Sequence, residues 1–251
     1  MKTRLLAPLA ATAFATLVAL AAEPPAATLS QLEKALSRSD PETLGRPARA
    51  TVHAVVSKPN GKAREEYLME TVVHADGTRE EKLIRAKKDG RDVTAEKLAE
   101  GKNRRKRRAA GDEPQGAPRA GGKKEPGSGK AALGLKFPTG EDRRLFVMGG
   151  PKTEGRFLVV AFEPAPGLKD ENLSRGRIGW NAASGEPAFI EAELVDPPTG
   201  LQELHVRGEF AGEGDAIYTS LLKTSGVGGI LWIKRRFEIT VELKDLTPAA
   251  P

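Results

Sequence analysis

The segment that decides the fold is Ile230-Leu-Trp-Ile-Lys-Arg-Arg-Phe-Glu-Ile-Thr-Val-Glu-Leu243, near the end of a chain of 251 residues. In its second half, Phe237, Ile239 and Val241 alternate strictly with charged or polar residues. Such alternation indicates a strand that packs one face on a core and leaves the other in water. One-sided strands are typical of antiparallel sheets. We therefore expect one long antiparallel strand from Ile230 onward.

Strand-forming patterns also fill the region upstream of this segment, between turns rich in Gly, Pro and Asp. The run Phe157-Leu-Val-Val-Ala-Phe162 is apolar in both phases, which predicts a central strand covered on both faces. The other strands predicted in this half of the chain span residues 144–148, 177–180, 189–195, 203–210 and 216–223.

The first half of the chain predicts a meander of three strands. Residues 48–56 alternate between apolar and polar positions, and a second strand ends at Val73. Asn60-Gly61 and Asp76-Gly77 supply residues that tolerate the positive φ of tight hairpins. A third strand through residues 83–84 completes the meander.

Helical signals are few. Leu29, Leu32 and Leu36 share one face of a short amphipathic helix that ends before Pro41. Residues 94–110 are rich in helix-forming residues but have almost no apolar face. Sheets of long antiparallel strands with only one or two helices tend to curl or close. The expected fold class is therefore mainly β, a single domain formed by residues 22–100 and 132–247 with a tail at 248–251.

The N-terminus has the anatomy of a signal peptide. Lys2 and Arg4 precede an uncharged apolar run, and Ala19-Leu20-Ala21 supplies small residues before a cut. The alternative, a membrane anchor, needs about 20 strongly apolar residues, whereas this run is alanine-rich and contains Pro8. We expect residues 1–21 to be removed. The chain has no cysteine, which excludes disulfides and a lipid-modified cysteine, so the expected location is the bacterial periplasm, with secretion as the alternative.

Residues 101–131 form a basic, Gly- and Pro-rich insertion that we expect to be disordered, because it cannot bury enough apolar surface. Residues 101–130 contain ten Lys or Arg against three acidic residues, whereas the rest of the mature chain is mildly acidic. The predicted contacts to an anionic surface are Lys102, Arg104, Arg105, Lys106, Arg107 and Arg108. The alternative is a solvated loop without function. Nucleic acid is not an expected partner, since the protein is exported and no aromatic residues are interleaved for stacking.

The sequence contains no recognisable catalytic or metal-binding constellation. His53, His74 and His205 are predicted on separate strands without a metal-ligand spacing, and no G-x-S-x-G nucleophile motif occurs. Glu191 and Glu193 lie two residues apart on one strand, and paired carboxylates can serve as acid and base. The residues that alternate with them are apolar, so we interpret the two glutamates as part of the solvent-exposed side of a one-sided sheet. We expect no enzyme activity, no cofactor and no metal.

Arg235 interrupts the apolar phase of the last strand, two residues before Phe237. Such an arginine either points into a cavity, where it meets a carboxylate or lipid head group, or is displaced by a β-bulge or a local exit to solvent. The flanking Lys234 and Arg236 favour the bulge or the exit.

The order of four segments resembles the outer-membrane lipoprotein-sorting and carrier (LolA-like) proteins and related bacterial envelope proteins. The resemblance covers residues 45–100 and 132–247 and is carried by Phe157-Leu-Val-Val-Ala-Phe-Glu-Pro-Ala-Pro166, Gly176-Arg-Ile-Gly-Trp-Asn181, Gly185-Glu-Pro-Ala-Phe-Ile-Glu-Ala-Glu-Leu194 and Ile230–Leu243. It implies a strongly curved antiparallel sheet, an open half-barrel whose concave face is covered by helices and holds acyl chains of lipids or lipoproteins. The carriers lack a long basic insertion like residues 101–130.

The leading functional hypothesis is a non-catalytic periplasmic protein that binds lipids or lipoproteins, with no membrane-spanning segment after cleavage. Its candidate apolar lining, with the arginine beside it, is Ile190, Leu194, Phe237, Ile239, Val241 and Arg235. The same apolar rows are equally explained as plain core. The alternative function is an envelope scaffold whose basic loop docks on an anionic surface or partner.

Overall fold

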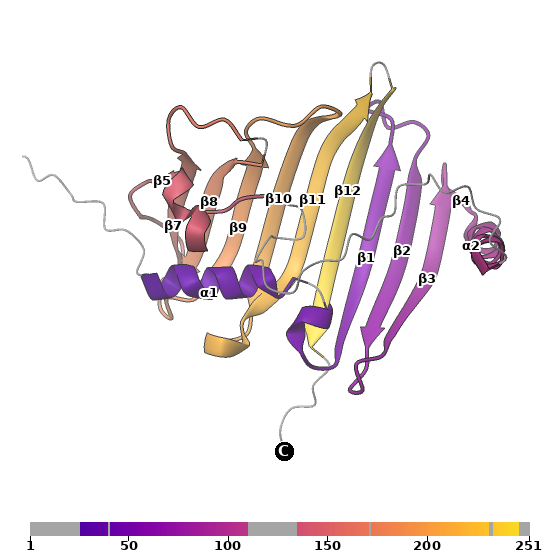
Figure 1. Ribbon diagram of the computed structural model, residues 1–251, viewed down its shortest axis with the longest axis horizontal. Coiled ribbons are helices and arrows are strands. Elements are labelled where there is room, and N and C mark those ends of the chain that lie inside the picture. Colours follow the sequence, from indigo (N-terminus) through magenta and orange to yellow (C-terminus); the bar gives the residue numbers. More distant parts are fainter. Residues whose placement is uncertain (1–25, 40, 110–134, 171, 231–232, 246–251) are drawn as a thin grey trace, which may run out of the picture.

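The computed structural model describes residues 26–39, 41–109, 135–170, 172–230 and 233–245. These residues form one 12-stranded antiparallel sheet, and helix α1 (Ala26–Ser37) lies across one of its faces (Figure 1). The strand order is β4-β3-β2-β1-β12-β11-β10-β9-β8-β7-β5, with β6 paired to β7. The sheet begins at β4 and ends at β5 without closing, so the expected class, mainly β with an open antiparallel sheet, is confirmed.

Most strands are long, and most consecutive strands are joined by short turns. In the first half, the elements are η1 (Pro41–Leu44), β1 (Ala48–Ser57), β2 (Glu65–Val73), β3 (Arg79–Lys88), β4 (Arg91–Asp92) and α2 (Thr94–Ala109). The second half contains η2 (Gly140–Leu145), β5 (Phe146–Met148), β6 (Lys152–Glu154), β7 (Phe157–Pro164), β8 (Ser174–Asn181), β9 (Pro187–Leu194), β10 (Leu201–Ala211), η3 (Gly214–Ala216), β11 (Tyr218–Ile230) and β12 (Ile233–Asp245).

The predicted meander of β1, β2 and β3 is confirmed, and its turns use the expected residues. Gly61 and Gly77 adopt φ values of +76° and +78°, a region that costs glycine little. The chain therefore reverses sharply after β1 and again after β2.

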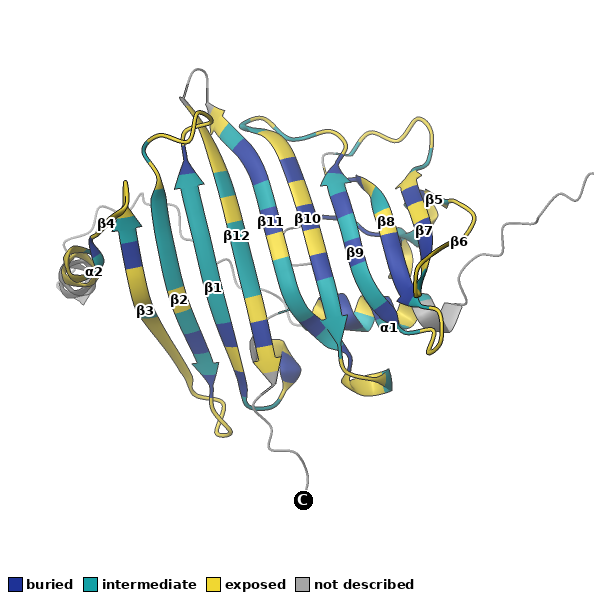
Figure 2. Cartoon of the chain, turned by 180° about the vertical axis from the view of Figure 1, so that it is seen from behind, coloured by how far each residue is buried: buried dark blue, intermediate teal, exposed yellow. Residues whose placement is uncertain are grey.

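Alternation along the strands gives the sheet two different sides. In β10 the side chains of Leu204 and Val206 are buried, whereas those of Glu203, His205 and Arg207 are exposed, and the bands alternate in Figure 2. We call the side that α1 covers the helix side and the other the polar side.

Helix α1 covers part of the helix side with the apolar face that its sequence predicts. Leu32 and Leu36 are buried, and Leu29 packs beside them. Their main partners in one core are Phe137, Phe146, Val160, Phe162, Ile178, Trp180, Ile190, Leu194, Leu204 and Val206. The fold therefore concentrates its apolar burial between α1 and strands β7 to β10.

Polar contacts also fix α1 to the start of β11. The Thr219 hydroxyl donates a buried hydrogen bond to the Ala35 carbonyl at 2.8 Å, and the Lys34 ammonium lies 2.5 Å from Asp215. Arg38 donates to the backbone carbonyls of Asp215 and Ile217. These contacts set the position of the helix end over the sheet.

Two strand predictions were wrong. The long last strand from Ile230 is two strands, because Ile230 ends β11 and pairs with Ile233 of β12. The intervening Leu231-Trp232 contains no turn-forming residue, so the pattern gave no sign of a hairpin. Strand β7 is not covered on both faces, since Leu158 is 38% exposed. Among the described strands, only the short β5 and β6 lie beyond β7.

Residues 101–109, the first part of the insertion that we expected to be disordered, are helical. Helix α2 continues to Ala109, and it begins beside β3, where Val93 and Ala86 are buried and Thr94 hydrogen-bonds Ala86. The predicted disorder of the remainder lies outside the described residues, as do the signal peptide and the tail.

Candidate functional site

The helix side of the sheet continues past α1 as an apolar surface on β12, β1 and β2. We call this surface the open apolar face; it consists of Val52, Ala54, Val56, Tyr67, Met69, Phe237, Ile239 and Val241. Met69 is 39% exposed, and the others are half-buried. An apolar surface of this kind in water is unfavourable and marks a candidate binding site.

Strand pairing places these side chains together. Val52 lies opposite Val241, Ala54 opposite Ile239, and Val56 opposite Phe237. Residues directly opposite in an antiparallel pair share one side of the sheet. On the far side of β1, Tyr67 and Met69 of β2 lie opposite Ala54 and Val52. The result is a three-strand patch built from the beginning and the end of the chain.

The patch lies on the same side as α1. Leu204, which packs in the core with α1, lies opposite Gly226 of β11, and Gly226 lies opposite Phe237. A Cβ atom on Gly226 would come within 2.8 Å of the Phe237 ring. The Phe237 ring therefore packs over Gly226, which has no side chain. Through this contact Phe237 joins the covered core to the open apolar face.

Of the predicted lining residues, the structure brings Phe237, Ile239 and Val241 into this patch. Ile190 and Leu194 lie elsewhere, in the core between α1 and the sheet, where their exposures are 0% and 9%. A ligand cannot reach those two side chains while α1 is in place.

Arg235 is exposed at the end of the same row. It pairs with Gly228 in an unbroken register with β11, so no β-bulge displaces it. The sequence left a cavity, a β-bulge and an exit to solvent as alternatives for this side chain, and the structure shows the exit to solvent. Its guanidinium is available to an anionic group at the end of the open apolar face.

The sequence did not reveal the lining residues contributed by β1 and β2. Their alternation was visible, but the sequence does not show that the first strand of the sheet pairs with the last. The predicted anionic-surface residues from Lys102 to Arg108 belong to helix α2, and their side chains lie outside the described residues.

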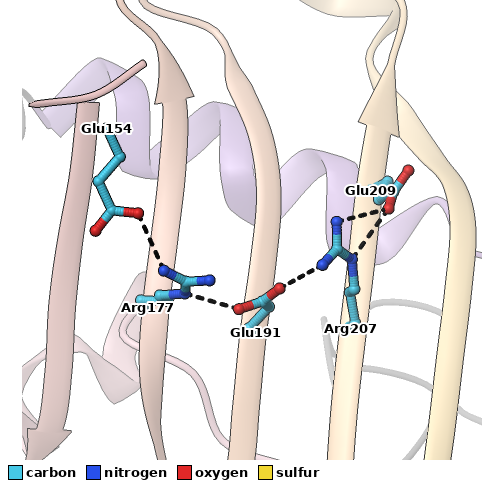
Figure 3. A network of polar contacts seen from close by, with 5 residues as sticks. All are labelled: Glu154, Arg177, Glu191, Arg207 and Glu209. Atoms are coloured by element: carbon cyan, nitrogen blue, oxygen red, sulfur yellow. Dashed lines mark hydrogen bonds and ion pairs between the residues drawn. The ribbon is translucent and has the colours of Figure 1, made fainter. Parts of the chain in front are cut away.

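The polar side carries a network of ion pairs that joins β6, β8, β9 and β10 (Figure 3). Arg177 lies 3.1 Å from Glu154 of β6 and 2.7 Å from Glu191, and Arg207 lies 2.6 Å from Glu191 and 3.0 Å from Glu209. A shallow groove of about 630 Å³ opens along this side, over strands β7 to β11.

The arginines and glutamates on β8, β9 and β10 in this groove pair with one another. The Glu191 hydrogen bond raises the pKa of Arg177, and the Glu191 carboxylate is shared between two arginines. A second pair joins Arg175 to Glu193 at 2.6 Å. Glu191 and Glu193 therefore form part of a solvated face and have no arrangement suited to acid–base catalysis.

The histidines do not converge. His53 lies 3.2 Å from Glu66 and lowers its pKa, whereas His205 lies 3.5 Å from Glu193. His74 follows β2 in the turn rather than lying within a strand, a correction to the predicted placement. Within the described ranges, no group of three or more acidic, histidine or cysteine side chains is arranged to hold a metal. No helix in the same part of the chain has both the length and the apolarity to span a bilayer.

Comparison with known proteins found no matching family model and no matching curated protein. Among solved structures, the chain is similar to a LolA superfamily protein of Nitrosomonas europaea, with a TM-score of 0.32, 9% identity, and coverage of 88% of this chain and 94% of the other. It is also similar to a putative outer membrane lipoprotein-sorting protein domain from Vibrio parahaemolyticus, with a TM-score of 0.32, 11% identity, and coverage of 89% and 93%. The resemblance suggested by the sequence thus recurs among solved structures, while the function has to be argued from the residues of this chain.

Proposed function

We propose that the protein binds an acyl chain of a lipid or lipidated protein on the open apolar face, as a non-catalytic carrier in the bacterial periplasm. The observation that carries this proposal is the half-buried apolar patch on three adjacent strands, outside the area that α1 covers.

The chemistry of the patch suits a flexible hydrocarbon. It is built from aliphatic side chains with Phe237, Tyr67 and the adaptable thioether of Met69. Each methylene group removed from water contributes about 0.8 kcal/mol. An extended acyl chain lying along β12 and β1 therefore gains affinity from many small contacts without a specific polar partner.

Arg235 determines which end of the site receives the head group of the ligand. It stands in the row of Phe237 and Ile239, near the start of β12, where β12 pairs with the end of β11. A charge-assisted hydrogen bond to a phosphate or carboxylate suits an exposed guanidinium. The expected ligand therefore has its anionic head at this end and its acyl chain toward Val241.

Native mass spectrometry with lipid extraction tests the proposal on protein exported with its own leader and purified from a bacterial periplasm. The wild-type chain is expected to carry a stoichiometric acyl-chain adduct. Ile239→Asp puts a charge on the patch and is expected to lose the adduct.

Thr240→Asp is the matched control, since it adds the same charge one residue later on the polar side and should keep the ligand. A clean apo mass for the wild type, unchanged when lipids are offered, would rule out the carrier and leave the scaffold function. Equal loss in both variants would point to general destabilisation, and thermal unfolding of both proteins detects it.

A further inference from the structure

One end of the sheet is strongly cationic. It is the end at which β1 and β3 finish and β2, β4 and β12 begin, because Ser57 pairs with Arg236, Glu65 with Lys88, and Lys88 with Arg91. We call this end the cationic rim; its exposed basic residues are Lys58, Lys62, Arg64, Lys88, Arg91, Lys234, Arg235 and Arg236.

Most of these cations have no acidic partner in the described part of the chain. Arg64 lies 3.6 Å from Glu66, and Lys88 lies 4.0 Å from Glu65. The acidic residues of the β3–β4 turn are engaged locally: Asp89 accepts the Arg64 backbone N–H, and Asp92 accepts that of Thr94. The rim therefore presents a surplus of positive charge to solvent.

The opposite end of the sheet has a different balance. Its turns, short helices and strand ends carry the acidic residues Glu42, Asp76, Glu80, Glu186, Glu213 and Asp215. Two of the cations at this end are ion-paired, Arg79 with Glu42 and Lys34 with Asp215. The charge is thus polarised along the strands, and an anionic partner is attracted to the rim end.

We infer that the cationic rim docks the protein on an anionic lipid bilayer. The rim crosses five neighbouring strands, from β4 to β12, which is about 20 Å at the usual strand spacing. The rim is an extended row of strand ends and not a pocket. It is therefore better suited to contact many lipid head groups in one plane than to bind one small ligand.

Two features favour a bilayer over nucleic acid or an acidic protein. The β1–β2 and β3–β4 turns of the rim include no aromatic side chain for base stacking. The rim also borders the apolar site, since Arg235 belongs both to the rim and to the row of Phe237 and Ile239. Docking at this end brings the mouth of the open apolar face to the head groups, which shortens the path of an acyl chain through water. Docking itself does not depend on ligand binding.

Vesicle sedimentation tests the inference with exported, full-length mature protein. Wild type is expected to pellet with vesicles of phosphatidylcholine and phosphatidylglycerol, to stay in solution with phosphatidylcholine alone, and to be released by high salt. The rim variant is Lys58→Glu, Lys62→Glu, Arg236→Glu, which leaves Arg235 in place. Since each cation near an anionic surface changes the binding constant about fivefold, the variant should bind at least about a hundredfold more weakly.

The matched control is Lys82→Glu, Arg144→Glu, Lys152→Glu, three exposed cations away from the rim with the same change of net charge. It should bind like the wild type. Equal binding by the rim variant and the control would overturn the inference, as would tighter binding of wild type to duplex DNA or to an acidic polypeptide than to anionic vesicles at equal ionic strength.

The acyl-binding proposal and the membrane-docking proposal can be disproved independently of each other. Ile239→Asp is expected to lose the acyl adduct but to pellet with anionic vesicles, and the rim variant is expected to keep the adduct but to stay in solution. Loss of sedimentation in Ile239→Asp, with its fold intact, would show that the acyl site rather than the rim holds the membrane.

Discussion

Val52 lies directly opposite Val241, so the first strand of the meander and the last strand of the chain are neighbours in the sheet. This pairing joins β1, β2 and β3 to the strands under α1 and creates the open apolar face. The interaction is non-local, and it should be visible in stability as well as in binding.

A double-mutant cycle tests this pairing. Val52→Ala and Val241→Ala each remove apolar contact from a half-buried position and should each destabilise the fold by about 1 kcal/mol. Because the side chains are cross-strand neighbours, the double variant should be less destabilised than the sum by roughly 0.5 kcal/mol or more. Urea unfolding measures the three free energies, and strict additivity would argue against the register.

Gly226 should not tolerate a side chain. A Cβ atom would lie 2.3 Å from the Glu203 carbonyl oxygen and 2.8 Å from the Phe237 ring. Gly226→Ala should therefore lower the unfolding free energy by about 1–3 kcal/mol and displace Phe237. Gly101→Ala is the comparison: it lies in α2, meets nothing within 4 Å, and should be neutral or stabilising by up to about 1 kcal/mol. Similar losses in both variants would contradict the packing.

The contact between Thr219 and α1 makes a third prediction. Thr219→Val keeps the shape of the side chain but removes the buried hydroxyl that donates to Ala35. The expected cost is about 1 kcal/mol, because the Ala35 carbonyl keeps a backbone hydrogen bond from Arg38. Thr153→Val, on an exposed strand residue, should change the thermal midpoint little. An unchanged midpoint for Thr219→Val would mean that the hydroxyl does not hold the helix.

The ion pair of Lys136 with Asp170 predicts a pH dependence. The ammonium lies 2.5 Å from the carboxylate, and this hydrogen bond is the main cause of a lowered Asp170 pKa. A carboxyl whose pKa is lower in the folded state adds stability above its unfolded pKa, near 4, and loses it as the pH falls through the folded pKa. Asp170→Asn should therefore be less stable than wild type at pH 7, and the difference should vanish in acid. Denaturant unfolding measures the difference in unfolding free energy between wild type and Asp170→Asn at each pH. If this difference persisted at low pH, the effect would be due to packing and not to the ion pair.

Much of the fold could be predicted from alternation and turn residues. Phe237, Ile239 and Val241 predicted a one-sided strand, and Gly61 and Gly77 marked real hairpins, because these features depend on local sequence. The break between β11 and β12 could not be predicted, since Leu231-Trp232 resembles the strands that flank it. The position of β7 near the edge was also hidden, because an apolar run fits a central strand equally well.

The site was predicted only in part for a related reason. Strand phase tells which side a residue faces, but it does not tell which strands are neighbours or where α1 comes to rest. Ile190 and Ile239 have the same local pattern, yet α1 buries one of them and leaves the other on the open face. The contributions of Val52 and Tyr67 depend on the pairing of β1 with β12 and β2, which only the assembled sheet shows.

Photo-crosslinking with a diazirine-bearing fatty acid tests the acyl site most directly, with the labelled peptides identified by mass spectrometry. The predicted adducts fall on β12, β1 and β2, at residues 237–241, 52–56 and 67–69, and they are competed away by unlabelled lipid. Labelling confined to the groove on the polar side, around Ala161 and Arg177, or no labelling above that of an unrelated protein, would contradict the proposal that the open apolar face carries the ligand.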